Sequence, residues 1–316
     1  MLYPPTPVRA SGFLQVDDRH RVYWEESGSP DGCPVLVLHG GPGASGGALS
    51  RRWLDSRVCR LITFDQRGCG RSTPFASVVA NTTQDLLGDI EVLRRHLDVE
   101  KWIVWGHSWG ATLALAYAER SPLQVGGLVL CSPFTATAGE FAWIYGGGAG
   151  DQFPQQWSAF RGAVDASDNA AVVECSVRAL HGPDAERSDE AAAAWCAWED
   201  FLAGVPARAV APTPGAARSR AIIGAHFARH AGFLADGELL DRLHQIPAVP
   251  IHVVHGVEDH LIPVRVSEAL TARLRSAHLL TVNGAGHDPS HPALLVAMVK
   301  AGEAVVYESR HSRRAA

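Results

Sequence analysis

A serine between glycines is the residue of this sequence with the clearest chemical potential. Ser108 lies in the segment Trp105-Gly106-His107-Ser108-Trp109-Gly110, after the apolar run Trp102-Ile103-Val104 and before the small-residue run 111–116. This order predicts a buried strand that turns sharply into a helix, with the serine held in a strained backbone conformation that exposes its hydroxyl. The flanking glycines avoid collisions of a Cβ with the neighbouring backbone. Ser108 is therefore the predicted nucleophile, and the first N–H groups of the helix would face an oxyanion formed there.

A serine attacks at neutral pH only when a base takes its proton and a further group orients that base. Asp259 follows a predicted strand at 250–254, and His287 follows the next predicted strand at 277–282. Both loops would lie at the edge of an open α/β sheet where ligands bind. We therefore predict His287 as the base and Asp259 as its partner.

Neighbouring residues leave alternatives for these roles. Glu258 is a second candidate for the acid, and His291 is a second candidate for the base, while Asp288 adjoins His287. His107 and His255 are interpreted as packing residues, because a histidine next to Ser108 in the sequence points away from its hydroxyl.

A second donor for the oxyanion is expected after the first buried strand. The turn His39-Gly40-Gly41-Pro42-Gly43 follows the apolar run 35–38, and its glycines let a backbone N–H turn toward the reacting centre. The predicted donors are the N–H groups of Trp109 and Gly41, with Gly40 as the alternative to Gly41.

The elements that must position these residues alternate between strand and helix. Apolar runs of strand length are found at 35–38, 60–64, 102–104, 127–131, 250–254 and 277–282, and helical patterns at 82–97, 109–118, 264–275 and 292–306, after a hairpin at 12–25. This alternation favours an α/β fold with a mostly parallel, doubly wound sheet. The residues from 309 to 316 are expected to form a frayed tail.

The middle of the chain has a different character. Between 134 and 246 no run is typical of a buried strand, and helices are predicted at 155–164, 170–180, 189–202, 219–228 and 236–244. We interpret this stretch as an all-helical cap domain inserted into a core domain formed by residues 1–133 and 247–316.

Composition restricts the possible partners. The 316 residues carry a formal net charge of -5, and the one cluster of basic residues is 310–314, so nucleic acid is not expected as a partner. No stretch approaches the roughly 20 apolar residues of a membrane span, and the N-terminus lacks signal-peptide features, so we expect no membrane association and a cytoplasmic location. The six cysteines and 15 histidines show no metal-ligand spacing, and neither a metal nor a cofactor is predicted. The sequence does not indicate an oligomeric state.

Three longer motifs resemble the proline iminopeptidase (prolyl aminopeptidase) family of α/β-hydrolases. They are the turn at 39–43, the run Asp65-Gln66-Arg67-Gly68-Cys69-Gly70-Arg71-Ser72, and the segment 106–115. The resemblance continues at 194–199 and 226–227, and then at 255–259 and 284–287, so it spans nearly the whole chain. It implies the α/β-hydrolase fold, whose catalytic residues follow the order Ser, acid, His. It also implies release of an N-terminal proline through an acyl-enzyme, without a cofactor.

The resemblance further implies glutamates in the cap that pair with the amino terminus of the substrate. Gly224 and Ala235 stand where the family has these acids. The residues considered as replacements are Glu199, Asp200, Asp236 and Glu238, and the candidates for the substrate pocket are Trp143, Trp195, Trp198, Glu199, His226 and Phe227.

Three functions are compatible with this pattern. The first is a serine hydrolase that releases an N-terminal proline or similar residue from short peptides or amides. The second is a family member redirected to a neutral small-molecule ester, amide or thioester, for example in a biosynthetic pathway. The third is a non-catalytic binding protein that keeps the fold.

Overall fold

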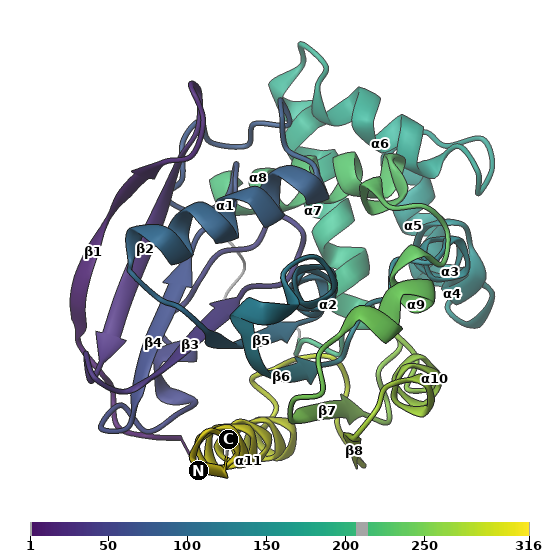
Figure 1. Ribbon diagram of the computed structural model, residues 1–316. Helices are drawn as coiled ribbons and strands as arrows, with labels where there is room; N and C mark the ends of the chain where they lie inside the picture. The colour runs from purple at the N-terminus through teal and green to yellow at the C-terminus, as the bar shows by residue number, and fades with distance from the viewer. Residues whose placement is uncertain (1, 207–213, 316) are drawn as a thin grey trace.

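The computed structural model describes residues 2–206 and 214–315, which contain one eight-stranded sheet with the strand order β1-β2-β4-β3-β5-β6-β7-β8 (Figure 1). Only the pairs β1-β2 and β2-β4 are antiparallel. The strands are β1 (Val8–Gln15), β2 (Arg21–Gly28), β3 (Cys33–Leu38), β4 (Cys59–Phe64), β5 (Trp102–His107), β6 (Val125–Cys131), β7 (Ile251–Gly256) and β8 (Ala277–Val282). The predicted mostly parallel sheet is confirmed.

Alternating residues of the parallel strands enter two separate apolar cores. Leu36 and Leu38 of β3 belong to the core that includes α1 (Thr83–His96) and α2 (Trp109–Arg120), whereas Val35 and Val37 belong to the core that includes α11 (Pro292–Ala315). Successive side chains of a strand point to opposite faces, so a sheet covered on both sides reads as a continuous apolar run. Figure 1 shows α11 on the side of the sheet away from α1 and α2.

The segment between β6 and β7 contains helices joined by loops and no strand among its described residues, and we call it the cap. It consists of α3 (Ala138–Tyr145), α4 (Gly148–Gln152), α5 (Pro154–Ala163), α6 (Val172–Leu180), α7 (Ala185–Leu202), α8 (Pro214–Arg229), α9 (Glu238–Arg242) and the 3-10 turns Ala231–Phe233 and Leu243–Gln245. The rings of Trp157, Phe160 and Trp198 contact one another within it, and those of Phe160 and Trp198 are stacked. Because this aromatic cluster lies inside the cap, we propose that 134–246 is a domain inserted into the core domain.

The structure also corrects three predictions of element boundaries. The helices α3 and α4 were not predicted, and α3 begins at a capping box in which Thr137 and Glu140 satisfy each other's N–H groups. The helix predicted at 189–202 begins at Ala185, because Asp184 accepts hydrogen bonds from the first turn. The prediction of a frayed tail at 309–316 was wrong up to Ala315. The helix α11 continues to that residue, and buried Ser309 donates a hydrogen bond of 2.7 Å to the Gly126 carbonyl.

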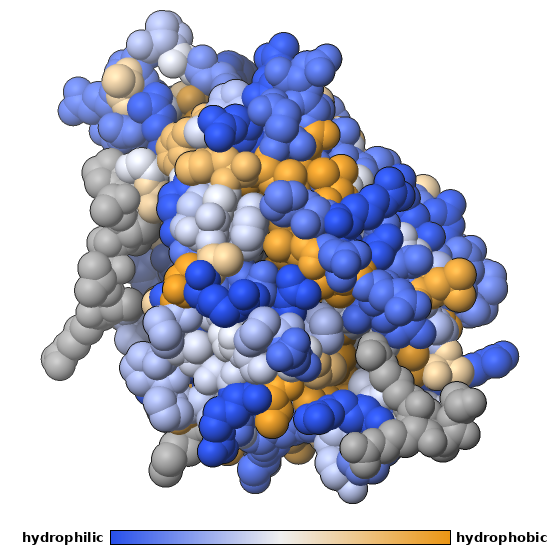
Figure 2. All heavy atoms as spheres, turned by 60° about the vertical axis from the view of Figure 1, so that its left-hand side comes forward, coloured by the Kyte–Doolittle hydropathy of each residue, from blue (hydrophilic) through white to orange (hydrophobic). Residues whose placement is uncertain are grey.

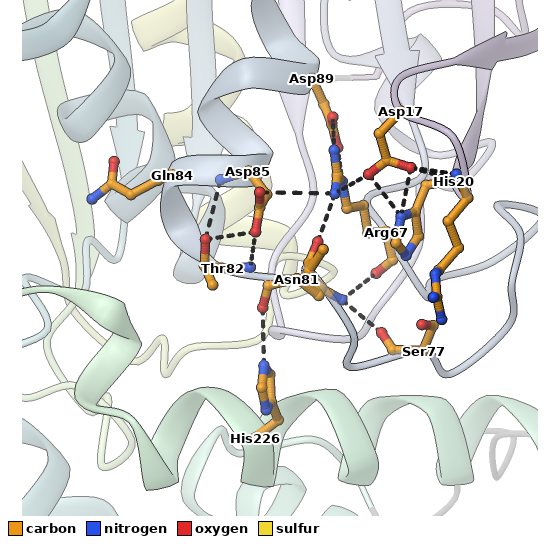
Figure 3. Close-up of polar contacts among 12 residues, drawn as sticks. Asp17, His20, Arg67, Ser77, Asn81, Thr82, Gln84, Asp85, Asp89 and His226 are labelled. Atoms are coloured by element: carbon orange, nitrogen blue, oxygen red, sulfur yellow. Dashed lines mark hydrogen bonds and ion pairs between the residues drawn. The ribbon is translucent and has the colours of Figure 1, made fainter.

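A buried arginine fixes the segment that follows β4. The Arg67 guanidinium forms hydrogen bonds of 2.6 and 2.7 Å with Asp89 of α1 and of 2.7 Å with Asp17 (Figure 3). The Asn81 side chain donates to the Arg67 carbonyl (3.0 Å), and the Asn81 carbonyl accepts from Nε2 of His226 on α8 (2.9 Å). A buried ion pair contributes little net stability but tolerates few geometries. Through these contacts, the segment after β4 fixes the positions of the N-terminal hairpin, α1 and the cap relative to one another.

The face on the β1 side is mainly hydrophilic with separate apolar areas (Figure 2). β1 is an edge strand, and Phe13 on it is 47% exposed, with the Arg21 guanidinium 5.0 Å from its ring centroid. Within the described ranges, no helix combines the length and the apolar composition needed to cross a bilayer.

Glu119 is a buried carboxyl group in the last turn of α2, near α9. Its side chain is 6% exposed, and Oε1 has no hydrogen-bond partner among the described residues. Burial raises the pKa of Glu119 to about 8, with Arg242 opposing the rise and Glu238 adding to it. A carboxyl group in such surroundings keeps its proton at neutral pH.

We expect Glu119→Gln to remove a pH dependence of stability. The folded carboxyl keeps its proton up to about pH 8, whereas the ordinary pKa of 4.5 applies in the unfolded chain. The free energy of unfolding of the wild type therefore falls as the pH rises between these values, by about 1.4 kcal/mol per unit. Urea unfolding at about pH 5.5 and about pH 7.5 should show the variant gaining about 2 to 3 kcal/mol over wild type.

Glu268→Gln is the matched control, because Glu268 lies exposed on α10 (Arg265–Arg273) and its replacement should leave the slope unchanged. A difference between Glu119→Gln and wild type that stays constant with pH would contradict the expectation.

Candidate active site

Ser108 occupies the turn between β5 and α2. Its φ of 57° lies in the left-handed region, which non-glycine residues rarely adopt, and its N–H donates to the Cys131 carbonyl of β6 (2.9 Å). A Cβ on Gly106 would lie 2.1 Å from the Gly110 carbonyl oxygen, and a Cβ on Gly110 would lie 2.2 Å from the Leu38 carbonyl oxygen. The two glycines therefore allow the helix to begin directly against β3 and β5.

Asp259 and His287 meet at the carboxyl ends of β7 and β8. Nδ1 of His287 is 2.7 Å from Oδ2 of Asp259, and the second oxygen of Asp259 accepts from the N–H groups of Leu261 (3.0 Å) and Ile262 (2.8 Å). Both side chains are buried, with 3% exposure for Asp259 and 5% for His287. A carboxylate on Nδ1 places the proton of the neutral ring there and leaves Nε2 free to accept one.

His255 contacts the same carboxylate, which the sequence did not reveal. Its Nε2 is 2.8 Å from the Ile262 carbonyl oxygen and 3.2 Å from Oδ2 of Asp259, and its Nδ1 is 2.6 Å from the Ser267 hydroxyl. Because a carbonyl only accepts, Nε2 carries the proton and Nδ1 accepts from Ser267. The packing role expected for His255 is therefore incomplete. Its position at the end of β7, four residues before Asp259, is the signal that could have indicated this contact.

The surroundings of Asp259 favour its ionised form. Burial alone would raise the pKa of Asp259, but the facing His287 and the hydrogen bonds from His255 and His287 hold it well below its usual range. The alternative acid Glu258 is exposed. Asp288 instead accepts from the N–H and hydroxyl of Ser290.

Backbone hydrogen bonds attach the His287 loop to the cap. The N–H groups of His287 and Asp288 both donate to the carbonyl of Ala203, the residue that closes α7, at 3.1 Å each. His107 is bound to the same loop, because its Nε2 lies 3.0 Å from the His287 carbonyl oxygen. In the described part of the chain no hydrogen bond joins the Ser108 hydroxyl to His287, a contact that commonly tightens only when substrate binds.

The turn after β3 lies against Ser108. A Cβ on Gly40 would be 3.3 Å from the Cβ of Ser108, while Gly41 has a φ of 119°. Buried Gln66 holds this turn, because it accepts from the Trp109 indole (3.2 Å) and donates to the His39 carbonyl (2.9 Å). Trp109 is the first residue of α2, so its backbone N–H has no acceptor within the helix. The predicted oxyanion donors therefore border one space.

That space is a pocket of about 370 Å³ between the core loops and the cap. Ser108 and His287 line it on the core side together with Gly40, Gly41 and Trp109. The cap contributes Phe141, Ile144, Tyr145, Glu199, Asp200, Arg220, Gly224 and Phe227. In the described residues no cluster of His, Cys, Asp or Glu could hold a metal ion.

Of the six residues predicted to line the substrate pocket, two lie at it and four do not. Glu199 and Phe227 line the pocket, whereas Trp143, Trp195, Trp198 and His226 are absent from its described lining. The Trp143 indole donates to the His260 carbonyl (2.9 Å), and the Trp198 indole donates to the Ile144 carbonyl (2.9 Å). His226 binds the segment after β4, as Figure 3 shows.

Glu199 is the centre of a buried polar cluster in the cap wall. It accepts from the Tyr145 hydroxyl (2.6 Å), the Trp195 indole (2.8 Å) and the Arg220 guanidinium (2.7 and 2.8 Å), and Arg220 also donates to Asp200 (2.6 Å). Burial would lower the pKa of Arg220, but Glu199 and Asp200 raise it well above its ordinary value. Sequence reasoning missed Arg220, although its place beside the apolar run 221–223 of α8 was a possible signal.

Only one of the two positions that lack an expected acid faces the pocket. Gly224 lines it, and a Cβ there would lie 3.0 Å from Nε1 of Trp195. Ala235 is exposed, and its N–H donates to Glu238 (2.9 Å). Asp236 accepts from the Ala138 N–H (2.8 Å). Of the four acids considered as replacements, Glu199 and Asp200 lie at the pocket.

We expect Gly110→Ala to destabilise the fold by about 3 kcal/mol, because the new Cβ would collide with the Leu38 carbonyl and force the backbone apart. Gly139→Ala in α3 is the control, since its Cβ would have no atom nearer than 3.9 Å. That change should be neutral or stabilising by about 0.5 kcal/mol. Urea unfolding of both variants measures the difference, and equal stabilities would refute the close contact.

Comparison with known proteins identifies relatives along the whole chain. A model of the alpha/beta hydrolase fold family matches residues 34–292. A proline iminopeptidase of Arabidopsis thaliana is 38% identical over 308 residues, covering 96% of this chain and 81% of the relative. Another from Neisseria meningitidis serogroup A is 38% identical over 298 residues, covering 94% and 96%.

Solved structures show the same fold. The crystal structure of a proline iminopeptidase-related protein from Thermus thermophilus superposes with a TM-score of 0.62 at 24% identity and covers 95% of this chain and 99% of that one. An esterase from Rhodococcus sp. ECU1013 gives a TM-score of 0.62 at 21% identity, with coverage of 95% and 98%.

Proposed function

Because this chain belongs to the proline iminopeptidase family of α/β-hydrolases, we propose that it is a serine hydrolase that releases an N-terminal proline or similar residue from short peptides or amides. The observation that carries the proposal is that Ser108, on a strained turn, shares one pocket with His287, whose Nδ1 is bound by Asp259. This arrangement supports nucleophilic catalysis with a base and an orienting acid.

The reaction proceeds in two halves at this site. Nε2 of His287 takes the proton of the Ser108 hydroxyl while the serine oxygen attacks the carbonyl of the N-terminal residue. The N–H groups of Trp109 and Gly41, or of Gly40 in place of Gly41, stabilise the oxyanion. His287 then gives its proton to the leaving amine, and an acyl-enzyme remains on Ser108. In the second half, His287 takes a proton from a water molecule that attacks the acyl group, and it then returns this proton to Ser108. The acyl group leaves as a free carboxylic acid.

Asp259 keeps His287 in the productive tautomer and stabilises the imidazolium that forms during attack. Its lowered pKa keeps the carboxylate ionised at neutral pH. His255 and the two N–H groups at Leu261 and Ile262 fix the carboxylate. We regard His255 as a positioning residue that acts through Asp259.

We expect Asp259→Asn to reduce kcat on proline arylamide by about 10³-fold to 10⁴-fold, because the amide would favour the wrong tautomer of His287. Its effect on KM should be small. Ser108→Ala should abolish both turnover and labelling by a fluorophosphonate probe, which the wild type should accept. Glu258→Gln is the matched control beside Asp259, and its exposed side chain predicts a change of less than about twofold. Labelling that persists in Ser108→Ala would refute the assigned nucleophile, whereas a wild type that the probe does not label would favour the binding-protein alternative.

A second candidate function is hydrolysis of a neutral ester, amide or thioester. The observation in its favour is that Gly224 faces the pocket without an acidic group and Ala235 lies outside it.

Proline arylamide and its N-acetylated form separate the two candidates in the wild type. A site specific for a free amino terminus should prefer the unblocked substrate by about a hundredfold in kcat/KM, as charge-assisted contacts of about 1.5–3 kcal/mol imply. Cleavage of both at similar rates supports the neutral class.

A further inference from the structure

We infer that Arg220 is a specificity-determining residue. It forms ion pairs with Glu199 and Asp200 in the cap wall, and it thereby weakens the selection of substrates with a free amino group. The inference rests on the proposed acyl transfer at Ser108, and it specifies the charge that the acyl pocket accepts.

The acceptor capacity of Glu199 is already used within the protein. A carboxylate offers about four lone-pair positions. Oε1 accepts from the Tyr145 hydroxyl (2.6 Å) and the Trp195 indole (2.8 Å), and Oε2 accepts from Nε (2.8 Å) and Nη2 (2.7 Å) of Arg220. Glu199 is 6% exposed. A substrate ammonium could bind this carboxylate only by displacing one of these donors.

Asp200 is partly used by the same guanidinium. Its Oδ1 accepts from Nη1 of Arg220 at 2.6 Å, while Oδ2 has no partner among the described residues. The Asp200 side chain is 31% exposed and that of Arg220 is 23% exposed. The cluster thus contains two carboxylates and one guanidinium, and its net charge is about −1. The uncompensated negative charge lies on Oδ2 of Asp200, the oxygen that Arg220 does not contact.

Arg220 is held firmly in place above the core loops. A Cβ on Gly43 would lie 2.7 Å from the Cα of Arg220, so α8 packs backbone to backbone against the loop that carries Gly41. The residue before it, Ser219, donates to the Gly68 carbonyl (2.9 Å). Arg220 lines the same pocket as Ser108, and its ion pairs with Glu199 and Asp200 fix its guanidinium in the cap wall.

A substrate with an ammonium group therefore meets a resident cation in this pocket. Among the described residues, the cluster offers it one free acceptor, Oδ2 of Asp200, and the charge of Arg220 opposes its binding. A neutral acyl group leaves no buried charge without a partner, because the cluster is satisfied within the protein. The cluster therefore lowers the preference of the pocket for a free amino group over a neutral or blocked one.

The test measures the ratio of kcat/KM for proline arylamide to that for its N-acetylated form. Arg220→Met removes the resident cation and frees acceptor positions on both carboxylates, so we expect the ratio to rise by about tenfold or more. Arg218→Met is the matched control on the same helix, because Arg218 is absent from the described lining and pairs with Asp189 at the surface. Its ratio should stay within about twofold of wild type.

Two further variants keep the test decisive if Arg220→Met folds poorly with Glu199 left unpaired. Asp200→Asn removes the one free acceptor at a partly exposed position, and we expect the ratio to fall by about threefold or more. The double variant Arg220→Met with Glu199→Gln restores the net charge, so its ratio should return to within about threefold of wild type.

The outcomes separate the inference from the proposed function. A ratio that is unchanged in both Asp200→Asn and folded Arg220→Met overturns the role of Arg220, while turnover of the two substrates and labelling of Ser108 would still support the hydrolase. Failure of the wild type to cleave either substrate, together with failure of a fluorophosphonate probe to label Ser108, overturns the hydrolase proposal itself.

Discussion

The close backbone contact between the start of α2 and the ends of β3 and β5 is the constraint on which the site depends. At Gly106 and Gly110 a side chain would overlap carbonyl oxygens of the neighbouring backbone. Because the helix begins so close to the sheet, Ser108 turns through a left-handed conformation, and Trp109, the first residue of the helix, lines the pocket. At Gly40 of the turn 39–43, a Cβ would lie 3.1 Å from the His107 carbonyl oxygen and 3.3 Å from the Cβ of Ser108, so this turn approaches Ser108 closely. One steric requirement thus positions the proposed nucleophile and both proposed oxyanion donors.

The parts that could be predicted from the sequence are those with a local physical signal. Apolar runs revealed the parallel strands, and the glycine spacing around Ser108 indicated the turn. The residues after β7 and β8 were expected at one sheet edge, where Asp259 and His287 do meet. The cluster of Glu199 with Arg220 could not be predicted, because it depends on how α7 and α8 pack. The tryptophans of α7 were misjudged for the same reason, since their periodicity does not show whether a helix face meets a ligand or another helix.

The proposed catalytic residues and the proposed specificity residues lie in different parts of the chain. Ser108, Asp259 and His287 belong to loops of the sheet, whereas Glu199 and Arg220 belong to the cap. The cap enters between β6 and β7, which are neighbours in the sheet and still pair directly. An insertion at this place interrupts no strand pairing, so the cap can vary while the sheet edge keeps its geometry. Arg220 of the cap contributes to the charge of the pocket from a part of the chain that is separate from the proposed catalytic residues.

The carbonyl of Ala203 links the cap to the sheet loop that carries His287 through hydrogen bonds. It closes the helix that bears Glu199 and accepts the N–H groups of both His287 and Asp288. A displacement of α7 that widens the pocket must either break these two bonds or pull the histidine loop along with it. The width of the pocket and the position of the proposed base are therefore coupled through a single carbonyl group.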